Sequence, residues 1–354
     1  MFNCNKPIYD SFIKLSLRRT AMKKFFRFTF CLVVLLVLSS LAFAETNKIK
    51  IGFIVKMPEQ TWFQLEWRFA EEAGKEYGFD VIKIGAQDGE KVLTAIDNLA
   101  AQKAEGFVIC TPDTKLGPAI MAKANAYKMK VIAVDDQFVN ADGSPMKDVV
   151  YLGISATKIG ETVGATLWKE FKARGWKPEE TGVLAITAKE LQTARERVEG
   201  AISVLVKNGF PKERIFESPQ RTTDIEGGFN AATPVITNNP LIKNWMVCAL
   251  NDDSVVGGVR ALEGRGFPPE RIIGVGINGD ATAINEFKKA TPSGFYASVL
   301  LAARVHGYET AKMLYKWIVD GVKPPLDTRT SGTLIDRTNY REVLAKNGLD
   351  DLLK

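Results

Sequence analysis

Ile51-Gly-Phe-Ile-Val-Lys-Met-Pro-Glu-Gln-Thr-Trp-Phe63 is the stretch that decides the fold of this chain. Its first five residues form an apolar run typical of a strand buried on both faces of a parallel sheet. Lys56, Trp62 and Phe63 follow the run, at the strand end where open parallel sheets bind ligands. A charged donor beside flat apolar rings suits a sugar, which offers hydroxyl groups and C–H faces. The alternative is a surface lysine beside two core aromatic residues.

Apolar runs alternate with amphipathic stretches along nearly the whole remaining chain. Strands are predicted at 48–55, 80–86, 106–111, 130–135, 149–154, 181–187, 244–250, 272–277 and 294–300. Helices are predicted at 61–77, 89–103, 156–174, 191–209, 253–265 and 304–320, with Asp88 capping one and Asp224 another. This alternation predicts an α/β fold with doubly wound parallel sheets. Residues 45–354 are too many for one typical domain, so we expect two lobes, and the lack of a linker suggests that they share the chain more than once.

Residues 1–44 are predicted to be a secretory signal peptide. A basic region that ends at Arg27 precedes the apolar run from Phe30 to Leu38, and the small-residue pattern Ala42-Phe-Ala44 follows. A transmembrane helix needs about 20 apolar residues, roughly twice the length of this run. We therefore expect export of the chain, with cleavage after Ala44.

Removal of the signal changes the charge of the protein. Residues 1–44 hold seven of the 47 lysines and arginines and one of the 41 acids, which leaves 40 of each and a net charge of zero. No basic surface for nucleic acid is therefore expected. Cys110 and Cys248 also remain, each within an apolar run, and we expect two buried thiols rather than a disulfide.

Polar side chains recur where predicted strands end. Asp135 and Asp136 follow one strand, Asn251 another and Asn278 a third. Each could simply cap a helix or close a turn, and we expect the two adjacent aspartates, as neighbours on an extended strand, to point to opposite faces. Their repetition at the binding edge instead favours a shared ligand site, to which Arg197 would add a planar donor.

Catalytic and cofactor motifs are weak in this sequence. The only histidine, His306, lies within an amphipathic helical pattern, and a structural role is predicted for it. The GxGxxG match from Gly274 to Gly279 falls in a strand instead of opening a helix, so nucleotide binding is not predicted. Asn140-Ala-Asp-Gly143 begins like a calcium loop but lacks its later ligands, and a tight turn is expected. We predict no enzyme activity, no cofactor and no metal site.

Several ordered segments together resemble a known family. They are Ile51-Gly-Phe-Ile-Val-Lys-Met-Pro, Gly106-Phe-Val-Ile-Cys-Thr-Pro-Asp113, Lys130-Val-Ile-Ala-Val-Asp-Asp-Gln-Phe-Val-Asn140, Thr193-Ala-Arg, Gly257-Gly-Val-Arg-Ala261, Gly276-Ile-Asn-Gly279 and Val305-His-Gly-Tyr308. Over essentially the whole exported chain, they are similar to the periplasmic sugar-binding proteins of ABC importers, and to the arabinose-binding group in particular.

The resemblance implies a fold and a role. The fold is periplasmic binding protein type I, two doubly wound lobes joined by a three-crossing hinge. The expected lobes are 45–154 plus 299–328 and 155–298 plus 329–354. The implied role is that of a monomeric periplasmic receptor, which closes on a monosaccharide and delivers it to an inner-membrane ABC permease. L-arabinose is the first expected ligand, followed by D-galactose, D-fucose or another aldose. The ligand-sensing core of a LacI-type regulator shares this fold, but a signal peptide stands here in place of its helix-turn-helix.

The resemblance also implies ligand-binding residues. Polar contacts are expected from Lys56, Gln60, Asp136, Arg197, Asn251 and Asn278, aromatic contacts from Trp62 and Phe63, and further contacts or support from Cys110, Asp135, Ile154, Leu191, Thr193 and Leu250. Asp136 would meet the anomeric hydroxyl, and Arg197 the ring oxygen. The sequence departs from the arabinose-binding pattern at four positions. Gln60 replaces a glutamate, Ile154 and Leu250 replace methionines, and Leu301 replaces a proline.

Overall fold

The computed structural model describes residues 48–354 of the chain. The predicted signal peptide and its cleavage site lie outside these residues. Ile49–Lys354 forms one compact unit. Among the described residues, no helix combines the length and apolar character needed to cross a membrane.

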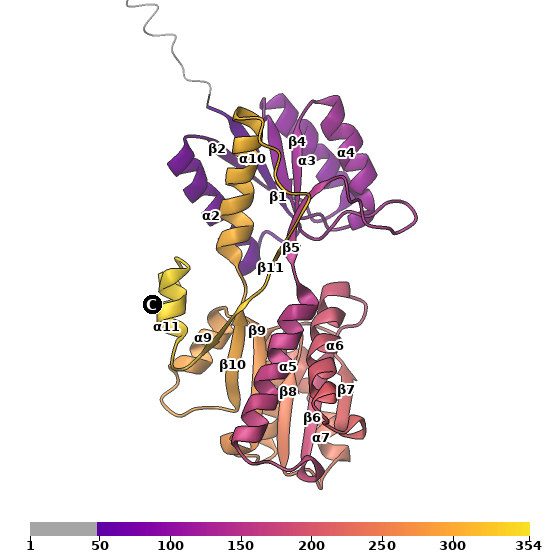
Figure 1. Cartoon of the computed structure of the whole chain (residues 1–354), viewed down its shortest axis with the longest axis vertical. Helices are drawn as coiled ribbons and strands as arrows, with labels where there is room; N and C mark the ends of the chain where they lie inside the picture. Colours follow the sequence, from indigo (N-terminus) through magenta and orange to yellow (C-terminus); the bar gives the residue numbers. More distant parts are fainter. Residues whose placement is uncertain (1–47) are drawn as a thin grey trace, which may run out of the picture. The chain divides into compact units, whose positions relative to one another are not determined.

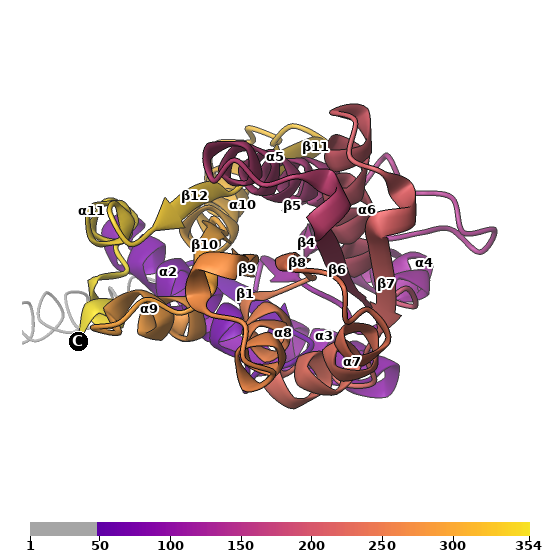
Figure 2. The ribbon, with the colours of Figure 1, turned by 90° about the horizontal axis from the view of Figure 1, so that it is seen from below.

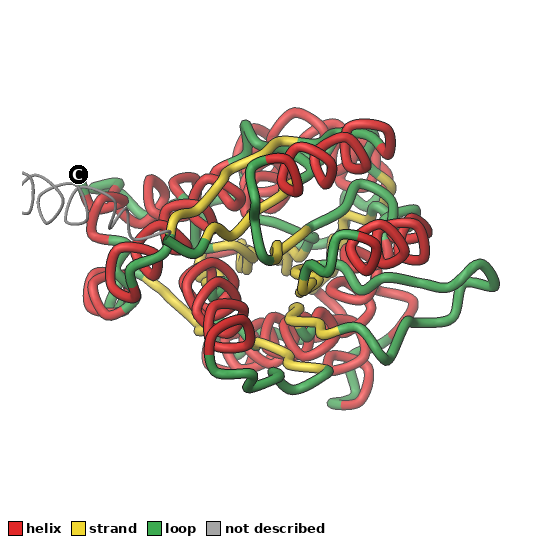
Figure 3. The backbone as a smooth tube through the Cα atoms, turned by 90° about the horizontal axis from the view of Figure 1, so that it is seen from above, coloured by secondary structure: helices red, strands yellow, loops and turns green. Residues whose placement is uncertain are grey.

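The first of two sheets contains six parallel strands in the order β11-β5-β4-β3-β1-β2 (Figure 1). Its strands are β1 (Lys50–Val55), β2 (Asp80–Gly85), β3 (Gly106–Ile109), β4 (Lys130–Asp135), β5 (Val150–Ile154) and β11 (Asp327–Thr330). Helices α2 (Thr61–Tyr77) and α10 (Thr310–Val319) cover one face, and α3 (Gly89–Ala101) and α4 (Gly117–Ala126) cover the other. Figure 3 shows this layering of helices around strands from above.

Strand β1 is buried on both faces, as its apolar run predicts. Ile51 and Phe53 belong to the core cluster that includes residues of α2, whereas Ile54 belongs to the cluster that includes residues of α3. This alternation is the two-residue period of a strand. A Cβ atom on Gly52 would lie 2.3 Å from a methyl carbon of Leu99, so the glycine lets α3 approach the sheet.

The second sheet has the order β12-β10-β9-β8-β6-β7, with β12 antiparallel to β10. Its strands are β6 (Thr181–Thr187), β7 (Ile215–Pro219), β8 (Asn244–Cys248), β9 (Ile272–Asn278), β10 (Phe295–Leu300) and β12 (Thr333–Asp336). Figure 2 shows α5 (Ala156–Ala173) and α6 (Gln192–Lys207) on one face, and α7 (Ile225–Asn238) and α8 (Asp252–Gly264) on the other. Helices α9 (Ala281–Lys288) and α11 (Tyr340–Lys346) complete this lobe, with the short turns η2 (Pro178–Glu180), η3 (Lys212–Arg214), η4 (Pro269–Arg271) and η6 (Asp350–Leu353).

The chain passes between the two sheets three times. It leaves the first sheet after Ile154, returns after Leu300, and crosses again between Thr330 and Thr333. Strand β10 thus continues to Leu300 in the second sheet, and β11 to Thr330 in the first. Each strand ends two residues beyond the lobe boundary expected from the sequence.

All nine predicted strands are present, with ends shifted by at most a few residues. Asp88 and Asp224 cap α3 and α7 as predicted, since each carboxylate accepts a backbone N–H of the first turn. Gly143 closes the predicted tight turn onto the carbonyl of Asn140. Three strands were not predicted: β7, β11 and β12. Four helices, α4, α7, α9 and α11, were not given as segments, although the cap of α7 was.

Two details of the prediction concern possible chemistry. Cys110 and Cys248 are buried free thiols, as expected. The glycines Gly274 and Gly276 lie inside β9, which confirms that they do not open a phosphate-binding turn.

The predicted helix 304–320 is not a regular α-helix over its whole length. It begins with a π-helical turn, η5 (Val305–Glu309), before α10.

Candidate functional site

A partly buried ion pair lies at the carboxyl ends of β1 and β4. The Lys56 amine donates to Oδ2 of Asp136, and Sγ of Cys110 lies 3.6 Å from the same oxygen. Burial alone would lower the pKa of Lys56, but the Cys110 sulfur and the carboxylates of Asp136 and Asp135 outweigh it and raise the pKa above its ordinary value. Lys56 is therefore charged at neutral pH and, beside the Asp136 carboxylate, ready to bond hydroxyl groups.

Asp135 has a left-handed backbone conformation, with φ of +63°. The strand is therefore not extended at this residue, which corrects the simple picture of two neighbours on opposite faces of a strand. Its carboxylate accepts Nε1–H of Trp62 at 3.0 Å and faces Nδ1 of His306 at 2.6 Å. Burial opposes the ionisation of Asp135, yet these hydrogen bonds and the His306 and Lys56 charges hold its pKa below the ordinary value. Its backbone carbonyl accepts the Tyr151 hydroxyl at 2.7 Å.

Arg197 enters from the first turns of α6, in the second lobe. Its Nη1 donates to the carbonyl oxygen of Leu250 at 2.7 Å, while its buried Nε has no hydrogen-bond partner among the described residues. Burial lowers the pKa of Arg197 to about 10, against the opposing charges of Asp135, Asp136 and Asp252. The guanidinium is thus charged at neutral pH and within electrostatic range of the acids of the first lobe.

Asn251 and Asn278 follow β8 and β9. Asn251 caps α8 by accepting the backbone N–H of Ser254 at 2.9 Å, and its amide donates to the carbonyl of Thr223 at 2.8 Å. The simple capping interpretation thus holds for Asn251, although an amide oxygen can accept a second bond. Asn278 has φ of +125°, and its side-chain amide makes a long 3.4 Å contact to Asp280. Strained backbone of this kind collects at ligand sites.

The remaining predicted contact residues differ in how far their side chains are exposed to solvent. Phe63 and Ile154 are buried, and Trp62 is half-buried and packs against two core clusters, one containing Phe63 and the other containing Ile154 and Leu301. Leu250 and Thr193 are partly exposed, whereas Leu191 is 47 % exposed just before α6. Gln60 is exposed at the start of α2, and its side chain does not cap that helix. The structure therefore brings Trp62 to the acids but leaves Gln60 and Leu191 at the surface.

No role was predicted from the sequence for two buried acids that support the predicted contacts, Asp252 and Glu66. Asp252 is fully buried, and its carboxylate accepts the backbone N–H of Gly279 at 2.8 Å and the Ser298 hydroxyl at 2.6 Å, so it anchors the loop that carries Asn278. Burial, reinforced by the charge of Asp280, raises the pKa of Asp252. Glu66 is the second acid. It lies on the face of α2 that carries Phe63, and an acid on the apolar face of a predicted helix is a signal that could have found it.

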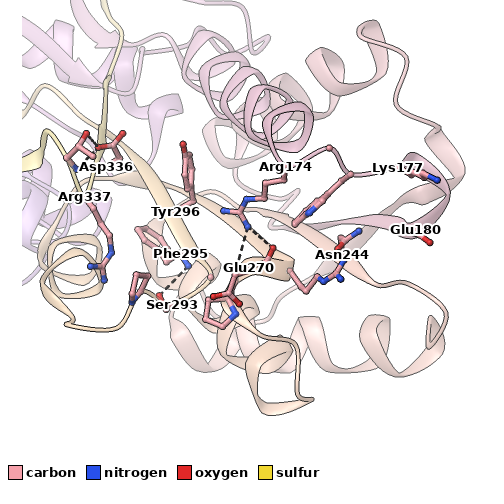
Figure 4. A pocket seen from close by; sticks show the side chains of 17 residues that line it. Arg174, Lys177, Glu180, Asn244, Glu270, Ser293, Phe295, Tyr296, Asp336 and Arg337 are labelled. Carbon is pink, nitrogen blue, oxygen red and sulfur yellow. Dashed lines mark hydrogen bonds between the residues drawn. The ribbon is translucent and has the colours of Figure 1, made fainter.

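A separate cavity of about 860 Å³ lies at the amino-terminal edge of the second sheet (Figure 4). It contains none of the predicted sugar contacts. Arg174, at its centre, already donates to the carbonyls of Glu270 at 3.1 Å and Ile272 at 3.0 Å, and its guanidinium stacks on Trp176. The carboxyl-end residues therefore remain the candidate site.

Residues 48–343 match the family of periplasmic binding proteins and sugar-binding domains of the LacI family. The chain belongs to this family. Solved structures share its fold, such as that of a solute-binding protein from Actinobacillus succinogenes with bound D-allose (TM-score 0.69, 19 % identity, covering 83 % of this chain and 100 % of that one). Another is an arabinose-binding protein from Geobacillus stearothermophilus (TM-score 0.65, 17 % identity, 84 % and 99 % covered).

Two curated relatives are much more similar in sequence. The L-arabinose-binding periplasmic protein of Escherichia coli (strain K12) is 51 % identical over 93 % of this chain and 99 % of its own length. An ABC transporter L-arabinose-binding periplasmic protein of Azospirillum brasilense is 52 % identical over 85 % and 90 %. Both relatives are named as L-arabinose-binding periplasmic proteins, and the second is named as part of an ABC transporter.

Proposed function

We propose that this protein is a periplasmic receptor that binds L-arabinose and delivers it to an inner-membrane ABC permease. The observation that carries the proposal is the sequence identity of 51 % and 52 % to two L-arabinose-binding periplasmic proteins over most of their length. The charged carboxyl-end residues support it, because Lys56, Asp136 and Arg197 offer bidentate and charge-assisted bonds to hydroxyl groups.

The ligand would lie between residues of the two lobes. Lys56, Asp135 and Asp136 extend from the first sheet, and Arg197 and Asn278 from the second lobe. Trp62 and Phe63 supply apolar contact from α2, and Ile154 and Leu250 line the wall; Gln60, Cys110, Leu191, Thr193 and Asn251 complete the proposed set. A sugar bound by both lobes favours their closed arrangement, which the permease would recognise.

A second sugar is favoured by a specific observation. Gln60 stands where the arabinose-binding pattern has a charged glutamate, and Ile154, Leu250 and Leu301 reshape the apolar wall. A methyl or hydroxymethyl group against such a wall changes binding by only about 1–3 kcal/mol. D-galactose and D-fucose are therefore the alternative ligands.

The cellular location, oligomeric state and partners of the protein are part of the same proposal. The signal peptide would be cleaved after Ala44, and the exported receptor would act as a monomer without a cofactor. Its zero net charge supports the absence of a nucleic-acid partner.

Titration calorimetry of residues 45–354 with five sugars tests the proposal: L-arabinose, D-galactose, D-fucose, D-xylose and D-ribose. We expect binding of one sugar per chain, tightest for L-arabinose and without turnover. Tightest binding of D-galactose or D-fucose would support the alternative ligand. No heat with any of the five at millimolar concentration would refute the receptor role.

A further inference from the structure

Glu66 is a buried acid with no hydrogen-bond donor as a partner among residues 48–354, which the structure describes. Its side chain is 0 % exposed, and in the ionised form neither carboxylate oxygen has a hydrogen-bond partner within the described part of the chain. An isolated buried carboxylate costs several kcal/mol, so native proteins neutralise or pair such a group.

A second carboxylate and the only histidine lie beside Glu66. An oxygen of Glu66, an oxygen of Asp135 and Nδ1 of His306 all lie within 4.8 Å of one another. Nδ1 of His306 is 2.6 Å from Asp135 but 3.8 Å from Glu66, so its proton goes to Asp135. Trp62 gives Asp135 a second donor.

The hydrogen bonds decide which acid carries a proton. Asp135 accepts from His306 and Trp62 and is stable as the carboxylate, whereas no donor of the described residues lies within hydrogen-bond distance of Glu66. A protonated Glu66 could instead donate to Asp135, which would satisfy both groups with one proton. The cause of the pKa shift agrees with this assignment, since burial and the charge of Asp135 raise the pKa of Glu66 well above its ordinary value. A metal ion here would have to displace the His306–Asp135 hydrogen bond.

The cluster also joins four parts of the fold. Glu66 and Trp62 come from α2, Asp135 ends β4, and His306 lies in the π-helical turn η5. Nε2 of His306 lies 2.8 Å from the hydroxyl of Thr330, the last residue of β11 before the third crossing. Helix α2 and η5 are in close contact, because a Cβ on Gly307 would lie 2.2 Å from the backbone oxygen of Glu66.

We propose that Glu66 is a positioning residue of the sugar site, which donates a hydrogen bond to Asp135 and, with His306, holds that carboxylate beside the Lys56–Asp136 pair and the hinge. This inference rests on the proposed function, because the site it positions is the sugar site. Other titratable or charged groups act on the cluster as well: Lys56, Cys110, Asp136, Tyr151 and Arg197. Substitution of Glu66 itself is therefore a cleaner test than a pH titration.

The test compares two variants of nearly equal length. Glu66→Gln keeps an N–H that can donate to Asp135, whereas Glu66→Met fills the same space without a donor. We expect Glu66→Gln to bind L-arabinose within about threefold of the wild type and Glu66→Met to bind about tenfold more weakly. Glu286→Gln is the control, a buried acid of the second lobe with its own lysine and serine partners, and its affinity should not change.

Difference infrared spectroscopy supplies the readout that a purely structural role would not give. The wild type minus Glu66→Gln spectrum at pH 7.5 should contain the C=O band of a protonated carboxylic acid. Absence of that band would overturn the inference, because an ionised Glu66 has no proton to donate. Equal affinities for Glu66→Gln and Glu66→Met would overturn it too. If Glu66→Met does not fold, the infrared band alone decides. A wild type that binds no sugar would refute the proposed function instead, and the infrared test would still apply.

Discussion

Arg197 has the hydrogen-bonding pattern expected of a residue that contacts a ligand. One guanidinium nitrogen donates a hydrogen bond to a carbonyl, and the buried Nε has no hydrogen-bond partner in the part of the chain that the structure describes. The cost of burying this cation is only partly offset in the free protein, which is typical of a group that serves binding more than folding.

Arg197→Ala should therefore weaken L-arabinose binding about 100-fold, roughly 3 kcal/mol, with little change in thermal stability. Arg195→Ala, an exposed arginine of the same helix, is the matched control and should leave the affinity unchanged. Calorimetry and thermal unfolding measure the two effects. Unfolding of Arg197→Ala at normal temperature would show that the side chain is structural.

Gln60 is the polar position at which the site departs from the arabinose-binding pattern. Gln60→Glu would restore a charged acceptor, and charge-assisted hydrogen bonds are about twice as strong as neutral ones. We expect the affinity for L-arabinose to rise several-fold, by about 1 kcal/mol. Equal affinities of the variant and the wild type in a calorimetric titration would show that residue 60 makes no contact with the sugar.

Asp135 links the site to stability at low pH. Because its folded pKa is held below the ordinary value, its contribution is complete above the unfolded pKa near ~3.9 and is lost as the pH falls through the folded value. Urea unfolding at pH 6 and pH 3 should show a smaller acid-induced loss in Asp135→Asn than in the wild type. Asparagine also tolerates the left-handed backbone of this residue. Identical losses would mean that Asp135 gains nothing from His306 and Trp62.

Helices α5 and α6 are the elements that carry Arg197 toward the site. A Cβ on Gly160 of α5 would lie 1.9 Å from the backbone oxygen of Arg197, and one on Gly164 would lie 2.4 Å from that of Ala201. These glycines let the two helices cross at close range, and they fix the height of Arg197 above the second sheet.

Gly160→Ala should lower the free energy of unfolding by about 1–3 kcal/mol through overpacking, and should weaken sugar binding by displacing α6. Gly264→Ala is the control, because a Cβ there meets no atom within 4 Å and helical alanine is favoured over glycine. Chemical denaturation together with calorimetry measures both. An unchanged stability of Gly160→Ala would contradict the close crossing.

The elements show how far the sequence predicts this fold and where it stops. Apolar runs such as 130–135 and 181–187 specify buried parallel strands and were predicted correctly. Strand β11, Asp-Thr-Arg-Thr, is polar and lies at the sheet edge, so it has no such signal. The π-helical turn η5 satisfies the same apolar spacing as an α-helix. Hydrogen-bond registry, which periodicity does not encode, distinguishes the two.

The candidate site could be predicted only in part, and the reasons are similar. Strand ends located Lys56, Asp136 and Asn278 at one edge of their sheets. Positive φ at Asp135 and the partners of Glu66 depend on contacts between α2, β4 and η5, which come together only in three dimensions. No local pattern could give them.

At the scale of the whole molecule, two sheets joined by three crossings form a hinge, and ligand contacts from both lobes would shift it toward closure. The cluster of Asp135, His306 and Thr330 connects the proposed sugar site to one of the crossings. Sugar binding and closure of the two lobes are therefore expected to occur together.

Small-angle X-ray scattering of residues 45–354, with and without saturating L-arabinose, tests this claim most directly. We predict a smaller radius of gyration with the sugar, and no change for Arg197→Ala at a concentration below its own Kd. Binding heat in calorimetry with an unchanged radius of gyration in the wild type would contradict closure on the sugar.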